Sequence, residues 1–141
     1  MKLISKLTQM NNGGILILRL VIGIIFIVHG TMKWSMWGME PSDQMPASTI
    51  TIMNLLSIAE PLGGVALILG FLTPYASIGL SIIMLGAINA KINMFHLKFV
   101  EQQAAGWEFD LLLLSGLLCI LFSGAGKFSI DKLLFKKNLY S

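Results

Sequence analysis

The sequence predicts an all-α protein, an integral membrane four-helix bundle with both termini in the cytoplasm. Of the 141 residues, 55% are hydrophobic and only 12% are charged, and the mean hydropathy is +0.80. Soluble domains of ordinary composition are about 25% charged. Four apolar stretches follow one another at about residues 14–33, 50–71, 75–93 and 107–124, as expected of membrane spans. A chain of this length fits one domain, so residues 1–141 are expected to form one transmembrane domain.

The first stretch, residues 14–33, is nearly pure hydrocarbon but carries three basic side chains, Arg19, His29 and Lys33. With a helical rotation of about 100° per residue, these positions fall within about 80° of one another. Charged residues inside a membrane span are costly, and they face a protein interior, a partner or a water-filled cavity. This basic stripe therefore indicates the face of the helix on which function depends.

The second stretch, residues 50–71, holds Glu60 near the middle of the bilayer, directly followed by Pro61. Proline removes a backbone hydrogen bond and kinks a helix. We expect Arg19 and Glu60 to form a buried ion pair, because Glu60 is the carboxylate that lies inside an apolar run and away from the outer surface. In an alternative arrangement, Arg19 extends its guanidinium to the inner surface.

The lysines predict the orientation in the membrane, since cytoplasmic tails and short loops are enriched in Lys and Arg. Both tails of the chain are basic, whereas the loop between the first two stretches carries Glu40 and Asp43. Both termini are therefore expected inside, and the third and fourth stretches then run outward and inward. The tail lysines are Lys2, Lys6, Lys127, Lys132, Lys136 and Lys137.

Polar side chains from three stretches then meet at the outer end of the bundle, where we predict a ligand site. His29 and Glu108 are the candidate catalytic groups, because both can transfer protons. Lys33 and Glu108 are expected to form an ion pair. Lys91 and Asp110 are interpreted as interfacial anchors. The predicted ligand-binding residues are His29, Lys33, Asn89, Trp107 and Glu108.

No metal site or cofactor motif is evident in the sequence. One cysteine, Cys119, excludes an intramolecular disulfide and a cysteine-rich zinc site. Haem ligation by His29 and His96 is disfavoured, because the chain has no haem attachment motif. The net charge of +3 does not predict nucleic-acid binding, because the lysines lie at the ends of the chain and of the helices. The expected partner of the surface is the lipid bilayer.

Four motifs, taken in order, resemble the DoxX family: RLVIGIIFIVHGTMKW from Arg19, AEPLGG from Ala59, GWEFDLLLL from Gly106 and GAGKFSIDKLL from Gly124. Their order and spacing cover nearly the whole chain, although the loop at residues 36–48 matches nothing in the family pattern. The resemblance implies a four-helix membrane protein of the bacterial cell membrane. It carries over Arg19, His29, Lys33, Glu60, Trp107, Glu108, Asp110, Ser129 and Asp131 as family positions.

The resemblance also implies a function. Relatives include quinone-linked oxidoreductase subunits and catechol- or quinone-detoxification proteins of the CatD type. The chain is therefore expected to be a membrane subunit of a redox or detoxification system for quinone- or catechol-like lipophilic molecules, with a protein partner in an oxidoreductase or respiratory complex. Two alternatives stay open: a non-enzymatic scaffold, favoured by a packed interior, and a small-molecule transporter gated by Arg19 and Glu60.

Overall fold

A computed structural model describes residues 11–102 and 104–135 of the chain. In this part the protein is helical and contains no strand, which confirms the predicted all-α fold class. The elements are α2 (Asn11–Met32), the 3₁₀ helix η1 (Lys33–Met36), α3 (Ala47–Leu69), α4 (Thr73–Asn93), α5 (Trp107–Ser123) and α6 (Ile130–Phe135).

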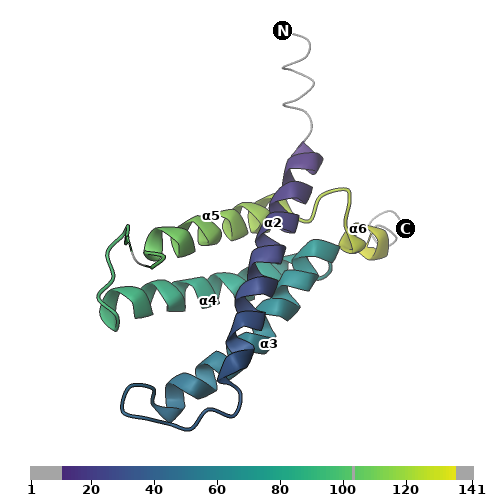
Figure 1. Cartoon of the computed structure of the whole chain (residues 1–141). Coiled ribbons are helices and arrows are strands. Elements are labelled where there is room, and N and C mark those ends of the chain that lie inside the picture. Colours follow the sequence, from purple (N-terminus) through teal and green to yellow (C-terminus); the bar gives the residue numbers. More distant parts are fainter. Residues whose placement is uncertain (1–10, 103, 136–141) are drawn as a thin grey trace.

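The helices form two pairs (Figure 1). α2 packs along α3 in one pair, and α4 packs antiparallel to α5 in the other. The short turn between α3 and α4 joins the pairs, and α6 lies beside this turn. At the opposite end, the start of α3 splays away from the loop that connects α4 to α5. The pairs are thus held together at one end and separate at the other.

α2 and α3 approach each other most closely at glycines. A Cβ atom on Gly23 would lie 2.7 Å from the Gly64 carbonyl oxygen, and one on Gly64 would lie 2.5 Å from that of Gly23. Further along α2, a Cβ atom on Gly30 would lie 2.5 Å from Pro61 Cγ. Small residues let helix backbones pack closely in membranes. This register places Glu60, the neighbour of Pro61, against the last turn of α2.

In the part of the chain that the structure describes, three helical segments are long and apolar enough to cross a membrane, and they cover Asn12–Met36, Ala47–Leu69 and Thr73–Asn93. α5 is shorter, with 17 residues. α3 and α4 begin slightly before the predicted starts at 50 and 75. Prolines explain both shifts, because Pro46 directly precedes α3 and Pro74 lies in the first turn of α4, where proline is well tolerated.

Arg19 joins the two helix pairs and the C-terminal loop. Its side chain is fully buried. Nε donates to the Leu67 carbonyl oxygen at 2.7 Å, and Nη2 donates to that of Ile68 at 2.9 Å. Nη1 donates to the carbonyl oxygens of Phe128, at 3.0 Å, and Ala125. The last carbonyls of a helix have no partner within it, so the guanidinium satisfies the end of α3 and the loop after α5 together.

Asp131, in the first turn of α6 directly after this loop, binds the turn between α3 and α4. Its carboxylate accepts hydrogen bonds from the backbone N–H of Leu72 at 2.7 Å and of Thr73 at 2.8 Å. These bonds cap the first turn of α4. The Asp131 N–H in turn donates to the Gly70 carbonyl oxygen at 2.8 Å, and Ser129 is buried against Gly70. Ser129 and Asp131, carried over by the family pattern, therefore hold the fold together.

The structure does not bring Arg19 and Glu60 together, contrary to the predicted ion pair. Glu60 pairs with Lys33 at the other end of α2. Arg19 also does not extend to a surface, because it is fully enclosed. The physical reason is that carbonyl groups at a helix C-terminus carry partial negative charge, so main chain replaces the carboxylate that the sequence argument required.

We expect Arg19→Met to lower the free energy of unfolding in detergent by about 2–4 kcal/mol, because buried carbonyl oxygens that lose a donor cost about 1–3 kcal/mol each. Denaturant or thermal unfolding followed by circular dichroism measures this loss. Lys127→Met is the matched control: Lys127 is exposed on the same loop, and its change should stay within about 0.5 kcal/mol. The losses of stability from Arg19→Met and Glu60→Gln should add. Strong coupling between the two substitutions would show that the side chains interact, as the sequence predicted.

Candidate ligand-binding site

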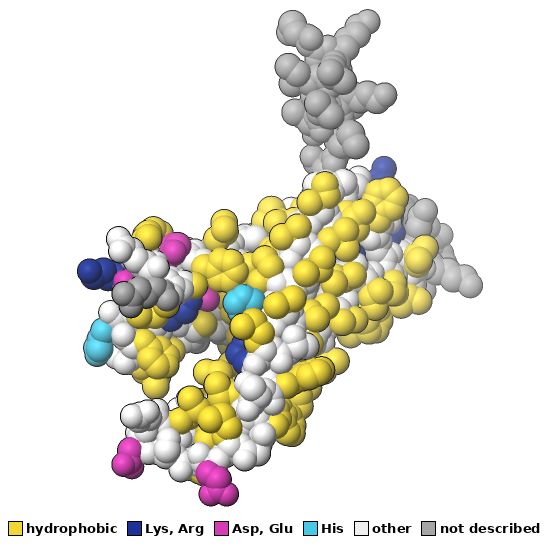
Figure 2. All heavy atoms as spheres, in the orientation of Figure 1, with side chains coloured by type: hydrophobic (Ala, Val, Ile, Leu, Met, Phe, Trp, Pro, Cys, Tyr) yellow, Lys and Arg dark blue, Asp and Glu magenta, His cyan; other side chains and the backbone are white. Residues whose placement is uncertain are grey.

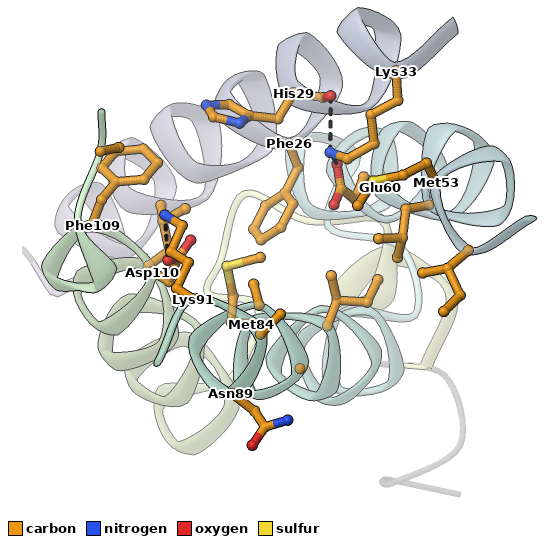
Figure 3. Close-up of a pocket in the computed structure, with 18 of the residues that line it drawn as sticks. Phe26, His29, Lys33, Met53, Glu60, Met84, Asn89, Lys91, Phe109 and Asp110 are labelled. Carbon is orange, nitrogen blue, oxygen red and sulfur yellow. Dashed lines mark hydrogen bonds and ion pairs between the residues drawn. The ribbon is translucent and has the colours of Figure 1, made fainter. Parts of the chain in front are cut away.

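A cavity of about 490 Å³ lies between the splayed ends of α2, α3, α4 and α5. Figure 2 shows the surface hollowed between these ends, with hydrophobic side chains around much of the opening. Figure 3 looks into the cavity and shows that side chains from all four helices reach it. The labelled lining residues are Phe26, His29, Lys33, Met53, Glu60, Met84, Asn89, Lys91, Phe109 and Asp110.

Glu60 pairs with Lys33 on the α2–α3 side of the cavity (Figure 3). Lys33 Nζ lies 2.5 Å from Glu60 Oε2, and the two side chains are 20% and 4% exposed. The same ammonium donates to the His29 carbonyl oxygen at 3.0 Å. Lys33 therefore does not pair with Glu108 as predicted, because the close α2–α3 register brings Glu60 to it first.

A second ion pair faces the cavity from the α4–α5 side. Lys91 Nζ lies 2.7 Å from Asp110 Oδ2 and donates to the Gly106 carbonyl oxygen at 3.1 Å. Asp110 is buried. Lys91 and Asp110 are thus partners rather than separate interfacial anchors, because antiparallel packing brings the last turn of α4 beside the first turn of α5. Opposite charges at the facing ends of two consecutive apolar stretches were the sequence signal for this pair.

Aromatic and sulfur-containing side chains form much of the remaining wall. The His29 ring stacks on Phe109, with ring centroids 5.6 Å apart and an interplanar angle of 25°. Phe26 and Met84 are buried at the wall between the helix pairs. Aromatic faces and the polarizable thioether both pack favourably against flat rings. The wall is therefore suited to a planar apolar group.

Asn89, Trp107 and Glu108 lie away from the polar centre of the cavity. Asn89 borders it, but its amide points outward in Figure 3 and accepts a hydrogen bond from Asn93 Nδ2 at 2.7 Å. Trp107 packs edge-on against Phe99, with ring centroids 4.5 Å apart. Glu108 is not among the lining residues, and its N–H donates to the Phe99 carbonyl oxygen at 3.2 Å. The structure thus assembles the predicted outer cluster only in part.

The two ion pairs give the cavity hydrogen-bond donors and acceptors without net charge. Lys33 and Lys91 supply ammonium donors, and Glu60 and Asp110 supply carboxylate acceptors. A few placed polar groups in mostly apolar walls are typical of small-molecule sites. Among residues 11–102 and 104–135, no group of three or more His, Cys, Asp or Glu side chains is arranged to hold a metal ion. The arrangement therefore fits a neutral ligand with a polar head and an apolar body.

Membrane-length helices around a mostly apolar cavity with two ion pairs define the class: a helical membrane protein. The sequence pattern of the DoxX family matches residues 14–97, and the chain belongs to this family. The resemblance found in the motifs is thereby confirmed.

Relatives with similar sequences extend over most of the chain. An uncharacterised protein of Haemophilus influenzae is 32% identical over 85% of this chain and 90% of its own length. A Bacillus subtilis protein named "Putative oxidoreductase CatD" is 29% identical, over 87% of this chain and 88% of its own. The inner membrane protein YqjF of Escherichia coli is 29% identical, over 92% and 98%. No solved structure matches. Together with the apolar helices, the family places the chain in the bacterial cell membrane.

A double-mutant cycle should report the Lys33–Glu60 ion pair. Lys33→Met and Glu60→Gln should each destabilise the protein in detergent, because each leaves a partly buried polar partner. The double variant should lose less stability than the sum of the two single losses, with a coupling energy of about 1–3 kcal/mol. Lys33→Met combined with Glu108→Gln serves as the control and should be additive. Coupling to Glu108 in place of Glu60 would contradict the observed pairing.

Proposed function

We propose that this protein is a membrane subunit of a redox or detoxification system and that it binds quinone- or catechol-like lipophilic molecules in the cavity. The observation that carries the proposal is an apolar cavity with two ion pairs on opposite walls. Its volume of about 490 Å³ lies within the range of about 300–1,000 Å³ typical of small-molecule sites. The similarity to a protein named as an oxidoreductase supports a redox role.

The polar groups can serve both redox forms of such a ligand. Quinone carbonyl oxygens accept hydrogen bonds, which the ammonium groups of Lys33 and Lys91 can donate. Catechol hydroxyls donate, and the carboxylates of Glu60 and Asp110 can accept. The ring would lie against the Phe109 wall. A site with donors and acceptors on two sides therefore recognises the ring in either state.

Reduction of a quinone to a catechol or hydroquinone requires two electrons and two protons. His29 lines the cavity and is proposed to deliver both protons in turn as a general acid, taking up a proton from water after each transfer. Glu108 lies outside the lining, so it could act only through intervening groups. The electrons are proposed to come from a protein partner in an oxidoreductase or respiratory complex, with this chain supplying the membrane site.

One observation favours the scaffold alternative. All four charged side chains in the cavity are already paired with one another, which a purely structural role would also require. Ligand binding remains the better proposal because a scaffold does not need a ligand-sized cavity between these pairs. The transporter alternative loses its proposed gate, since Arg19 and Glu60 lie in separate hydrogen-bond networks.

The proposed topology has four spans and both termini in the cytoplasm, with the cavity at the outer end. α5 would reach about 26 Å at 1.5 Å per residue, slightly less than the hydrocarbon core of about 30 Å. Local thinning of the bilayer accommodates such a mismatch at modest cost. The basic tails support this orientation.

The topology can be tested with cysteine variants in a Cys119→Ser background. A membrane-impermeant maleimide added to intact cells should label Asp43→Cys in the loop between α2 and α3. It should fail to label Ser141→Cys at the C-terminus until the cells are broken open. The opposite labelling pattern would reverse the proposed orientation.

Ligand binding can be tested with tetramethylbenzoquinone and purified protein. His29→Leu and Lys33→Gln should each weaken binding roughly tenfold to a hundredfold, because leaving a ring oxygen without its hydrogen-bond donor costs about 1–3 kcal/mol. Glu108→Gln lies outside the cavity lining and should leave affinity unchanged. His29→Leu and Lys33→Gln should also reduce the protection of cells against catechol or quinone stress, although both variants should still accumulate in the membrane. Full affinity and protection in both would favour the scaffold.

A further inference from the structure

A second hollow runs along the lipid-facing seam between α2 and α5. It has a volume of about 440 Å³ and an almost wholly apolar lining. Within this seam Ile22 packs against Gly116, and a Cβ atom on Gly116 would lie 2.5 Å from Ile22 Cδ1. We call this hollow the α2–α5 groove, and its residues used below are Leu18, Val21, Ile25, Phe109, Leu113 and Cys119.

The groove lies directly beside the ligand cavity. Ile25, Phe109 and Leu113 line both hollows, so one layer of side chains separates them. At its far end the groove reaches Leu18 and Cys119. The axial distance along α2 from His29 to Leu18 is about 16 Å at 1.5 Å per residue. An extended hydrocarbon chain that starts at the cavity could therefore follow the groove through about half of the bilayer.

We propose that the ligand is an amphiphile with a long hydrocarbon tail, whose polar ring occupies the cavity and whose tail lies in the α2–α5 groove. This inference rests on the proposed function and adds the class of ligand and its route of entry. The ion pairs suit the ring, whereas the groove offers only apolar contacts. The ligand enters sideways from the lipid, past Phe109, without passing through water.

The wall that the groove shares with the charged cavity favours such an amphiphile over a partner helix. A helix seated in the groove would cover Val21, which is half exposed, but would leave the polar cavity unoccupied. A phospholipid chain could fill the groove, but it would carry a charged headgroup into a cavity whose charges are already balanced. A neutral ring with a tail satisfies both hollows together. The cysteine reporters below distinguish this ligand from a partner helix and from a phospholipid chain.

Cys119, the one cysteine of the chain, reports on the groove in the full protein in lipid nanodiscs. The measured quantity is its rate of alkylation by N-ethylmaleimide with two probes, trimethyl-decyl-benzoquinone and tetramethylbenzoquinone. Both rings are fully substituted, so neither adds to the thiol. The tailed probe should slow alkylation roughly threefold or more, and the tailless probe should not, because only a tail reaches Cys119. The expected slowing is modest because lipid is as apolar as the groove, so the tail gains little free energy by moving from one to the other.

A second reporter separates the failure of this inference from that of the proposed function. Met53→Cys in a Cys119→Ser background lines the cavity, and both probes should slow its alkylation. If both protect Met53→Cys but neither affects Cys119, the ring site stands and the tail groove is wrong. If neither protects either cysteine, both proposals fail. Slow alkylation of Cys119 that no probe changes would indicate a phospholipid chain or a partner helix in the groove, and would overturn the inference.

A matched pair of substitutions tests the groove without cysteine chemistry. Val21 lines the groove and Ile24 does not, although they lie one turn apart on α2 and are 50% and 54% exposed. Val21→Trp should fill the groove and weaken binding of the tailed probe roughly fivefold, or about 1 kcal/mol. It should leave the tailless probe unaffected, and Ile24→Trp should change neither affinity. Equal effects of the two variants on the tailed probe would exclude a specific groove.

Discussion

A buried arginine bonded to main-chain carbonyls holds the two helix pairs together. Arg19 sits at the point where α3 ends, the chain turns into α4, and the loop after α5 returns. In the low dielectric of a membrane, both an isolated cation and unpaired carbonyls are costly, so each stabilises the other. Asp131 adds to this junction by capping α4. Because the pairs are joined at this end, they are free to diverge at the other, where the cavity lies.

The second constraint is the close packing of α2 on α3. The Gly23–Gly64 and Gly30–Pro61 contacts fix the relative height of the two helices. That height determines that Glu60 lies beside the end of α2, where Lys33 can reach it. The charged wall of the cavity is thus a consequence of glycine positions rather than of charge attraction alone. A bulkier residue at these glycines would push α2 and α3 apart and separate Glu60 from Lys33, although both charged side chains would still be present.

The cavity and the α2–α5 groove share one structural origin. Two pairs that are tightly packed internally but meet each other along a narrow seam leave spaces on either side of the contact. Where the seam space lies between the splayed ends, ion pairs from both sides line it. Where the space faces lipid, its walls are almost wholly apolar. The lining therefore changes from partly charged in the cavity to almost wholly apolar in the groove, and the proposed amphiphilic ligand matches this change.

The sequence alone determined the all-α class, the apolar helices and the family. These follow from composition, periodicity and motif order, which are local properties. Which charges meet was decided only by the tertiary structure: Lys33 with Glu60, Lys91 with Asp110, and Arg19 with carbonyl oxygens. Pairing across helices depends on their relative height and rotation, which glycine contacts and helix ends set. A partner made of main chain leaves no side-chain signal, so Arg19 could not be assigned from the sequence.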